Sequence, residues 1–256
     1  MAKPTSKPVV STGVNKWEEV LAALAVEASG QETVSGSFLS VRGATLSYKG
    51  ADCPDDKLNV VVLAAQHENL FYEGRYDADN PTPPVCYAFG ETEKGMAPHP
   101  EAPSPQSADC ASCPNNVWGS ADSGTGKACK NVRRIAVITE DDLESVVDAE
   151  MAQLKIPVTS VNNWGNYVAL LANTMKRPPF AVVTELSVVP DKKTQLKVLF
   201  KPVGQITDGG YLQALMDRRA GALQAMQQAY PVAQEKPEPP PKRGSAAGGS
   251  ANKRKY

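Results

Sequence analysis

Four of the five cysteines in this 256-residue chain fall in or beside one proline-rich stretch, and this coincidence constrains the fold more than any other feature. Eight prolines occur within the 34 residues from 81 to 114, so this stretch is neither a helix nor a central strand. A connection of this length inside a domain is usually functional or held in place by an external staple. We therefore expect the cysteines to order it.

The cysteine spacing favours a structural zinc site. In chain order it is Cys86-x23-Cys110-x2-Cys113-x15-Cys129. A Cys-x2-Cys turn wraps one tetrahedral ion, and two further thiolates complete a closed site that is structural rather than catalytic. Because the loop is poor in apolar residues, the metal would supply the free energy that orders it. We predict a structural Zn²⁺ ion bound by Cys86, Cys110, Cys113 and Cys129.

Other interpretations of the cysteines stay open at this point. Cys110 and Cys113 have the spacing of a redox pair, although they do not begin a helix after a strand. Disulfides need an oxidising compartment, but the N-terminus lacks a signal-like apolar segment, so a cytoplasmic location is expected. Unliganded reduced thiols are the simplest alternative. Cys53 is expected to be a free thiol, His99 to lie on the surface unless it replaces a sulfur, and His67 to lie in or near the core.

Motifs that would indicate an enzyme are incomplete. Residues 121–128 (ADSGTGKA) resemble a phosphate-binding loop, but Ala128 stands where a magnesium-binding Ser or Thr belongs, and no apolar strand precedes the segment. The His-x-Glu half of the zinc-deaminase signature is missing. Asp, Glu and His do not cluster with the spacing of a metal-dependent hydrolase. We expect a protein that is not an enzyme.

Charge is distributed unevenly, although the formal net charge is only −1. Residues 231–256 contain six basic and two acidic residues, so this segment carries +4 and the rest of the chain −5. The segment is rich in proline and glycine and almost without apolar residues, so we expect a disordered tail. The sequence therefore excludes a uniformly basic nucleic-acid binder but allows a confined basic groove. No apolar run approaches the ~18 residues of a membrane span.

Aromatic and basic residues alternate around the cysteines in the manner that single-stranded nucleic acid requires. Rings stack on exposed bases, each worth ~1–3 kcal/mol, and cations follow the phosphates. The alternative is that some of these rings belong to the core or pack on the cysteine turn. The candidate nucleic-acid-binding residues are Tyr72, Arg75, Tyr87, Phe89, Trp118, Lys127, Lys130, Arg133 and Arg134.

Hydrophobic periodicity outside the cysteine region predicts an α+β fold. Strands are expected at residues 38–48 (with a turn or bulge at Gly43), 58–64, 70–76, 132–138, 181–189 and 194–203, and helices at 17–28, 139–151, 164–175 and 211–230. Short strands and one long loop favour a β-barrel-like core of the oligonucleotide-binding (OB) kind with flanking helices. We divide the chain into an N-terminal arm and helix (1–30), a β-rich core (31–230) with the zinc-stapled loop at 81–131, and the disordered basic tail (231–256).

Three segments are informative together: residues 38–43 (FLSVRG), 72–77 (YEGRYD) and 110–120 (CASCPNNVWGS), the last leading to GKACK at 126–130. They resemble a family of bacteriophage and prophage single-stranded DNA-binding proteins that act in phage DNA replication and recombination. The resemblance covers roughly residues 35–230. It implies a β-barrel-like core, a zinc-binding insertion on the same four cysteines, and partners that include single-stranded DNA and replication proteins in the host bacterial cytoplasm. The basic tail departs from the acidic tail common among such proteins.

A second hypothesis concerns a protein partner. The same features suit a zinc-containing, non-enzymatic protein that docks on a phage or host polymerase. This hypothesis predicts weak DNA affinity and a stable protein complex. The sequence leaves the oligomeric state open.

Overall fold

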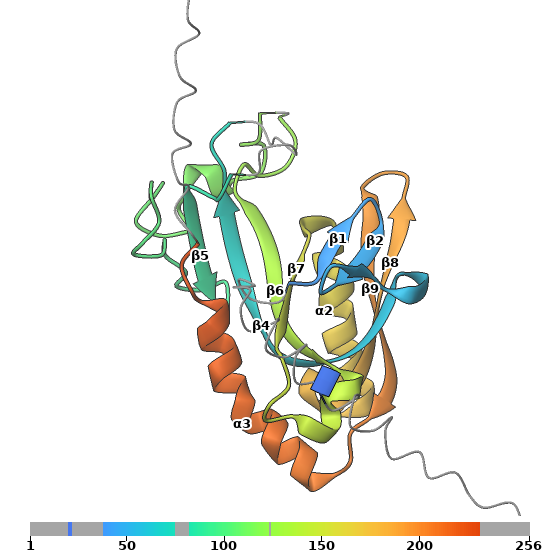
Figure 1. Ribbon diagram of the computed structural model, residues 1–256. Helices are drawn as coiled ribbons and strands as arrows, with labels where there is room; N and C mark the ends of the chain where they lie inside the picture. The colour runs from blue at the N-terminus through green and yellow to red at the C-terminus, as the bar shows by residue number, and fades with distance from the viewer. Residues whose placement is uncertain (1–19, 22–37, 75–81, 123, 231–256) are drawn as a thin grey trace, which may run out of the picture.

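The computed structural model describes residues 20–21, 38–74, 82–122 and 124–230, which form a mixed α+β fold of antiparallel sheets with flanking helices (Figure 1). The helix expected at 17–28 lies outside these residues apart from Val20 and Leu21, which are helical. Arg75 and the segment 231–256 also lie outside them. Within the described part of the chain, no helix is long and apolar enough to cross a membrane.

Two antiparallel sheets are built from the described residues. The main sheet runs in the order β7 (Ala152–Ile156), β6 (Lys130–Thr139), β4 (Lys57–Phe71), β8 (Val182–Asp191) and β9 (Gln195–Gln205), and β5 (Cys86–Gly90) adds to the end of β4. The smaller sheet consists of β1 (Ser40–Arg42), β2 (Thr45–Tyr48) and β3 (Ala51–Asp52). The described strands do not close into a barrel, because β7 and β9 end the main sheet without pairing with each other. The α+β class is thus confirmed, and the OB-like core is not.

β4 is the strand around which the main sheet is organised. One of its edges pairs with β6 from Val60 to Leu70. Two strands share its other edge: β8 pairs with residues 57–61 and β5 with residues 67–71. Among the described strands, none pairs with residues 62–66 on this second edge. We call this interval the open edge of β4.

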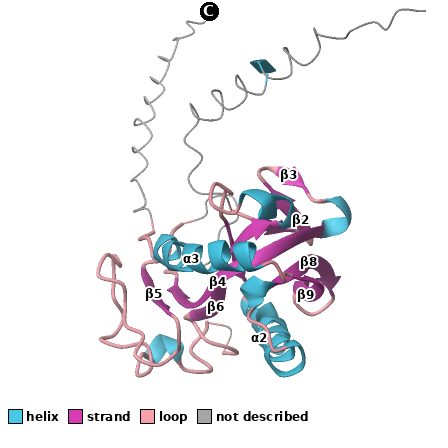
Figure 2. Cartoon of the chain, turned by 90° about the horizontal axis from the view of Figure 1, so that it is seen from below, coloured by secondary structure: helices cyan, strands magenta, loops and turns pink. Residues whose placement is uncertain are grey.

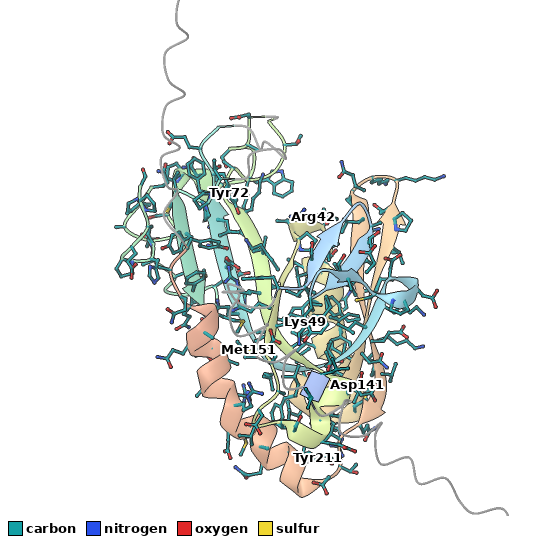
Figure 3. All side chains as sticks on the ribbon, viewed as in Figure 1. Arg42, Lys49, Tyr72, Asp141, Met151 and Tyr211 are labelled. Carbon is teal, nitrogen blue, oxygen red and sulfur yellow. The ribbon has the colours of Figure 1, made fainter. Side chains whose placement is uncertain are left out.

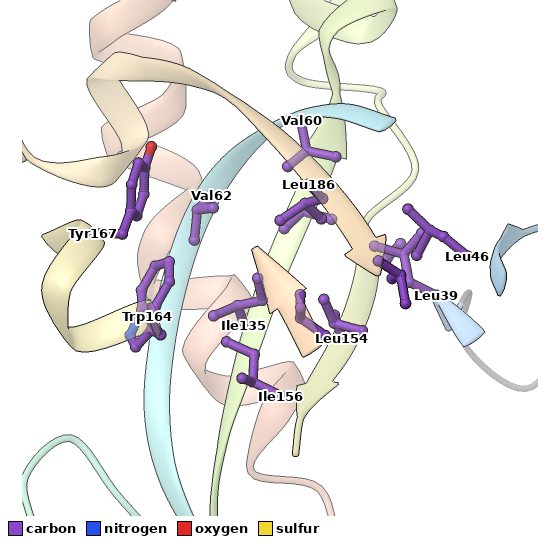
Figure 4. Packing of buried hydrophobic residues seen from close by; sticks show 14 of the residues in the cluster. Leu39, Leu46, Val60, Val62, Ile135, Leu154, Ile156, Trp164, Tyr167 and Leu186 are labelled. Atoms are coloured by element: carbon purple, nitrogen blue, oxygen red, sulfur yellow. The ribbon is translucent and has the colours of Figure 1, made fainter. Parts of the chain in front are cut away.

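Both faces of β4 are buried because helices cover them. The helices are α2 (Val161–Leu170), inside the curve of the sheet, and α3 (Gly209–Met226), along its outside (Figures 1 and 2). Val60 and Val62 belong to the core cluster that contains Trp164 of α2 (Figure 4), whereas Val61 belongs to the cluster that contains Leu215 of α3. A strand buried on both faces reads as a continuous apolar run, as residues 60–64 do.

Several expected elements are confirmed. β6 spans the strand expected at 132–138, and β8 and β9 form the expected hairpin. α2 continues as a π-helical turn (Leu171–Met175), so the helix expected at 164–175 is present. α3 is present as well, and its N-cap Asp208 accepts a hydrogen bond from the backbone N–H of Tyr211 (3.0 Å).

Other expectations were wrong in an instructive way. The two strands expected at 58–64 and 70–76 are one strand, β4, whose polar residues after position 64 lie inside the protein. The turn expected at Gly43 is confirmed, but it divides residues 38–48 into a hairpin and not one bent strand, because Gly43 and Ala44 have φ values of 58° and 69°, as a two-residue type I′ turn requires. The helix expected at 139–151 is a 3₁₀ turn (Glu140–Ser145) followed by an irregular segment.

Candidate nucleic-acid interface and metal centre

The four predicted zinc ligands line one small cavity at the end of β4. Cys86 begins β5 and pairs with Phe71, the last residue of β4. Cys129 immediately precedes β6, and Cys110 and Cys113 lie on the connection between the two strands. We call residues 86–129 the cysteine loop. The cavity encloses about 10 Å³, roughly the room of one water-sized sphere and hence of a single ion.

The surroundings of Cys86, Cys110 and Cys129 disfavour the charged form of their thiols. The pKa of Cys129 is raised to about 12, first by burial and then by the nearby sulfurs of Cys110, Cys113 and Cys86. Burial also raises the pKa of Cys86 and of Cys110. Four sulfurs that repel one another as thiolates form a donor set that a divalent cation would stabilise. Among the described residues no group of three or more His, Cys, Asp or Glu side chains stands in ligating geometry. What fits zinc is therefore the donor set and the size of the cavity.

Hydrogen bonds fold the cysteine loop back on itself. The backbone N–H of Cys129 donates to the carbonyl of Asn115 (2.8 Å), and that of Gly119 donates to the carbonyl of Gly126 (2.7 Å). Gly119 and Gly126 both have positive φ, which glycine adopts without strain. These contacts bring the segment after the Cys-x2-Cys turn beside the segment that enters β6.

An exposed indole and two lysines lie on the segments that these hydrogen bonds join. Trp118 is 77% exposed. Lys127 Nζ donates to the side-chain oxygens of Asn116 (3.1 Å) and Asn131 (2.9 Å), and Lys130 Nζ donates to the backbone carbonyl of Lys127 (2.9 Å). An exposed ring beside cations is the combination that stacks on a base and holds a phosphate. We call Trp118, Lys127 and Lys130 the loop patch.

A second group of the candidate residues packs together inside the protein. Tyr72, Tyr87 and Phe89 pack together with Tyr230, a residue that the sequence did not mark. The ring centroid of Tyr87 lies 5.0 Å from that of Tyr230, and the guanidinium of Arg134 lies 5.5 Å from the centre of the Phe89 ring. We call this group, with Arg134, the Tyr230 cluster. Tyr87 and Arg134 are covered by protein atoms, so they are not part of an exposed binding surface.

A buried ion pair anchors the Tyr230 cluster. Glu68 is 0% exposed and Arg134 5%. Arg134 donates to the Glu68 carboxylate through Nη2 (2.5 Å) and Nε (2.9 Å), and the Tyr230 hydroxyl donates to the same carboxylate. Burial raises the pKa of Tyr230, so its hydroxyl stays protonated and remains a donor. In sequence, Glu68 and Arg134 are 66 residues apart, and only the pairing of β4 with β6 brings them together.

Arg133 points to the opposite face from its neighbour Arg134, as successive residues of a strand do. Its Nη2 donates to Glu93 Oε1 (3.1 Å), and His67 Nδ1 lies 3.4 Å from the same oxygen. Burial, and then the charge of Arg133, lowers the pKa of His67, so this imidazole is neutral at pH 7. Arg133 shares its face of β6 with Asn131, which holds Lys127 of the loop patch.

The remaining residues that the sequence singled out lie apart from the cysteine cavity. His99 stacks on Tyr87 with ring centroids 5.1 Å apart, and it does not line the cavity. Cys53 is a free thiol buried in the core cluster under α2.

No protein-family model, curated protein or solved structure matches the chain. The functional argument therefore depends on the geometry of the chain itself.

Proposed function

We propose that the protein binds single-stranded DNA through the loop patch, with a structural zinc ion on Cys86, Cys110, Cys113 and Cys129 holding the patch in place. The observation that carries the proposal is the exposure of Trp118 on a hydrogen-bonded loop. An exposed indole offers a flat face on which an unpaired base can stack. The proposed role is to coat the strand, without catalysis.

The charges beside Trp118 favour a polyanion over a protein partner. Lys127 is held by two amide oxygens and Lys130 by a backbone carbonyl. Within the described part of the chain, no carboxylate forms an ion pair with either lysine. Their positive charges therefore stay available for phosphates. A polymerase-docking surface would use Trp118 equally well but would not need these two free charges.

Two further parts of the proposal come from the resemblance to phage single-stranded DNA-binding proteins. These are the role in phage DNA replication or recombination and the OB-like character of the core. Binding at the loop patch needs neither a closed barrel nor the basic tail. The same resemblance adds a replication protein as a second partner, because coating proteins work beside polymerases.

The test is a titration of labelled poly-dT with zinc-loaded protein at two salt concentrations. Binding should weaken with salt, because Lys127 and Lys130 displace counterions from the phosphates. Changing both lysines to Gln should lower the slope of log K against log salt by about 1.4, at about 0.7 for each contact with a single strand. The matched control changes Lys192 and Lys193, two exposed lysines of the β8–β9 turn, to Gln and should leave the slope unchanged.

Trp118→Ala tests the ring separately. It should weaken binding by ~1–3 kcal/mol, the value of one stacked base. Tyr211→Ala is the control, because Tyr211 is a partly exposed ring at the opposite end of the protein from Tyr72, the residue that follows β4 (Figure 3). Absence of binding to poly-dT at low salt would refute the proposal. A protein complex that depends on Trp118, together with unchanged DNA affinity, would favour polymerase docking instead.

A further inference from the structure

A cavity of about 250 Å³ lies at the open edge of β4. It is bordered by residues 62–67 of β4 itself, by Trp164 and Val168 of α2 and by Arg219 of α3. These helices belong to core clusters on different faces of the sheet. One cavity can reach both because no described strand fills the interval between β8 and β5. The interruption of the sheet is thus what creates the cavity.

The lining combines apolar walls with polar groups that lack partners. Trp164, Val168 and Phe180 supply flat apolar surface, and the Arg219 guanidinium lies 5.2 Å from the centre of the Phe180 ring. Gln66 is 1% exposed, and its Nε2 donates to the carbonyl of Met226 (3.1 Å). Gln66 Oε1 has no hydrogen-bond partner among the described residues. A buried acceptor left unmatched costs about 1–3 kcal/mol, which a ligand that donates to it would recover.

The open edge of β4 adds backbone groups to this lining. On one edge of a strand, every second residue directs both its N–H and its C=O outward. Residues 62–66 have no strand partner on this edge, so the cavity presents donors and acceptors side by side. β8 and β5 close the interval at its two ends, and this prevents an added peptide strand from continuing past it. The site suits a compact, planar ligand that has donors and acceptors along one edge.

A continuous path joins the cavity to the loop patch. Arg133 lines the cavity and lies two residues from Asn131 on the same face of β6. Asn131 in turn accepts a hydrogen bond from Lys127 (2.9 Å). Glu91 also lines the cavity, and Glu93 is bonded to Arg133 near it. Because Glu93 already pairs with Arg133, the lysines of the loop patch, which form no ion pair among the described residues, are the better partners for the phosphates.

We infer that the cavity holds one unstacked nucleobase of the strand that binds at the loop patch. This inference rests on the proposed function. The base stacks against the apolar wall formed by Trp164 and Val168, and its polar edge faces Gln66 Oε1 and the open edge of β4. Purines and pyrimidines both carry a donor and an acceptor on one edge, so the site selects for a base rather than for a sequence.

Tryptophan fluorescence separates the cavity from the loop patch. The chain has three tryptophans, so Trp17→Phe with Trp118→Phe leaves only Trp164, and Trp17→Phe with Trp164→Phe leaves only Trp118. Each variant is titrated with a short oligothymidylate at low salt. We expect quenching of both reporters. Quenching of Trp118 alone would overturn the inference that the cavity holds a base and would preserve DNA binding at the loop patch. Quenching of neither reporter would overturn both the inference and the proposed function. Quenching of Trp164 alone would support the cavity and contradict the loop patch.

A blocking substitution tests the same inference through affinity. Val168→Phe places a ring in the cavity and should reduce oligothymidylate affinity roughly tenfold, the value of one lost base contact. Leu170→Phe is the matched control, because Leu170 is exposed on the same helix and does not line the cavity. Wild-type affinity in a Val168→Phe variant that melts normally would overturn the inference. If that variant does not fold, the Trp164 reporter still decides the question.

Discussion

The buried ion pair of Glu68 and Arg134 allows a sharp prediction about stability. Arg134→Met keeps most of the side-chain volume but removes every donor that Arg134 gives to the Glu68 carboxylate. Because Glu68 is fully buried, its charge then keeps the Tyr230 hydroxyl as a hydrogen-bond donor and the electrostatic attraction of Lys155, but loses the guanidinium that was paired with it. Removing one member of a buried pair costs about 3–5 kcal/mol, and we expect the free energy of unfolding to fall by that amount.

The adjacent residue provides the control. Arg133→Met removes a guanidinium from the same strand, but its partner Glu93 is 73% exposed. An ion pair with a partner in water contributes about 0–1 kcal/mol, so this variant should lose less than about 1 kcal/mol. The assay is urea unfolding of the zinc-loaded protein at pH 7, followed by circular dichroism, with the free energies compared at equal m-values.

A triple variant tests whether the loss comes from the unpaired charge. Glu68→Leu, Arg134→Met and Tyr230→Phe together replace the polar network by apolar groups, and such a replacement is often neutral or stabilising. We expect it to be more stable than Arg134→Met alone. The reasoning would be refuted if Arg134→Met cost no more than Arg133→Met, or if the triple variant were as unstable as the single one.

Three further outcomes are expected. Purified protein should contain one zinc ion per chain. Cys113→Ser should make the cysteine loop sensitive to protease while the β8–β9 hairpin stays resistant. A cysteine loop as resistant in the variant as in the wild type would contradict the proposal that zinc orders it. The pKa of Asp191 is lowered to about 2, chiefly by a hydrogen bond from the Thr194 hydroxyl (2.7 Å). The Asp191 carboxylate therefore stabilises the fold at neutral pH. This contribution is lost as the pH falls from about 4 to about 2. Asp191→Asn should therefore melt below the wild type at pH 7, with a gap that narrows across that window, and a constant gap would contradict the assignment. Tyr167→Phe removes the buried hydrogen bond to Thr184 Oγ1 (2.5 Å) and should cost about 1 kcal/mol in urea unfolding, whereas a neutral effect would contradict that bond.

The elements that the sequence predicted well are those whose signal is local. The β8–β9 hairpin alternates with period two around its turn, and Asp208 marks the start of α3 because a cap needs only the next three residues. β7 had such a signal too, since Ala152, Leu154 and Ile156 are buried at every second position. We predict no strand at these residues, because the alternation spans only five positions.

The continuity of β4 was not predictable in the same way. Gln66, Glu68 and Asn69 look like the end of a buried strand, yet all three are inside the protein. They are tolerated because Met226, Arg134 and Asn131 each bond to one of them across the fold. No pattern within a short window contains those partners.

In the candidate site, too, some features follow from local sequence and others only from contacts between distant residues. Tyr87 and Trp118 are aromatic residues near cysteines, and the sequence treats them alike, but one is buried against Tyr230 and the other stands in solvent. What separates them is the pairing of β5 with β4, which directs Tyr87 into the sheet face opposite Arg133. Residue type predicted the chemistry of the interface, and strand register decided which residues are available to it.

The anchoring of Tyr230 fixes the point from which the basic segment 231–256 departs. Tyr230 is held against Glu68 and Arg134 on the sheet face opposite Arg133 and Asn131. The six basic residues of that segment therefore follow, in the chain, a residue that is anchored on the sheet face opposite the path to the loop patch. A shortened chain that ends after residue 230 keeps this anchor and the ion pair beneath it. One that ends after α3 loses Tyr230, the second hydrogen-bond partner of the Glu68 carboxylate. Among the described residues, the fold therefore extends at least to Tyr230, four residues past the end of α3.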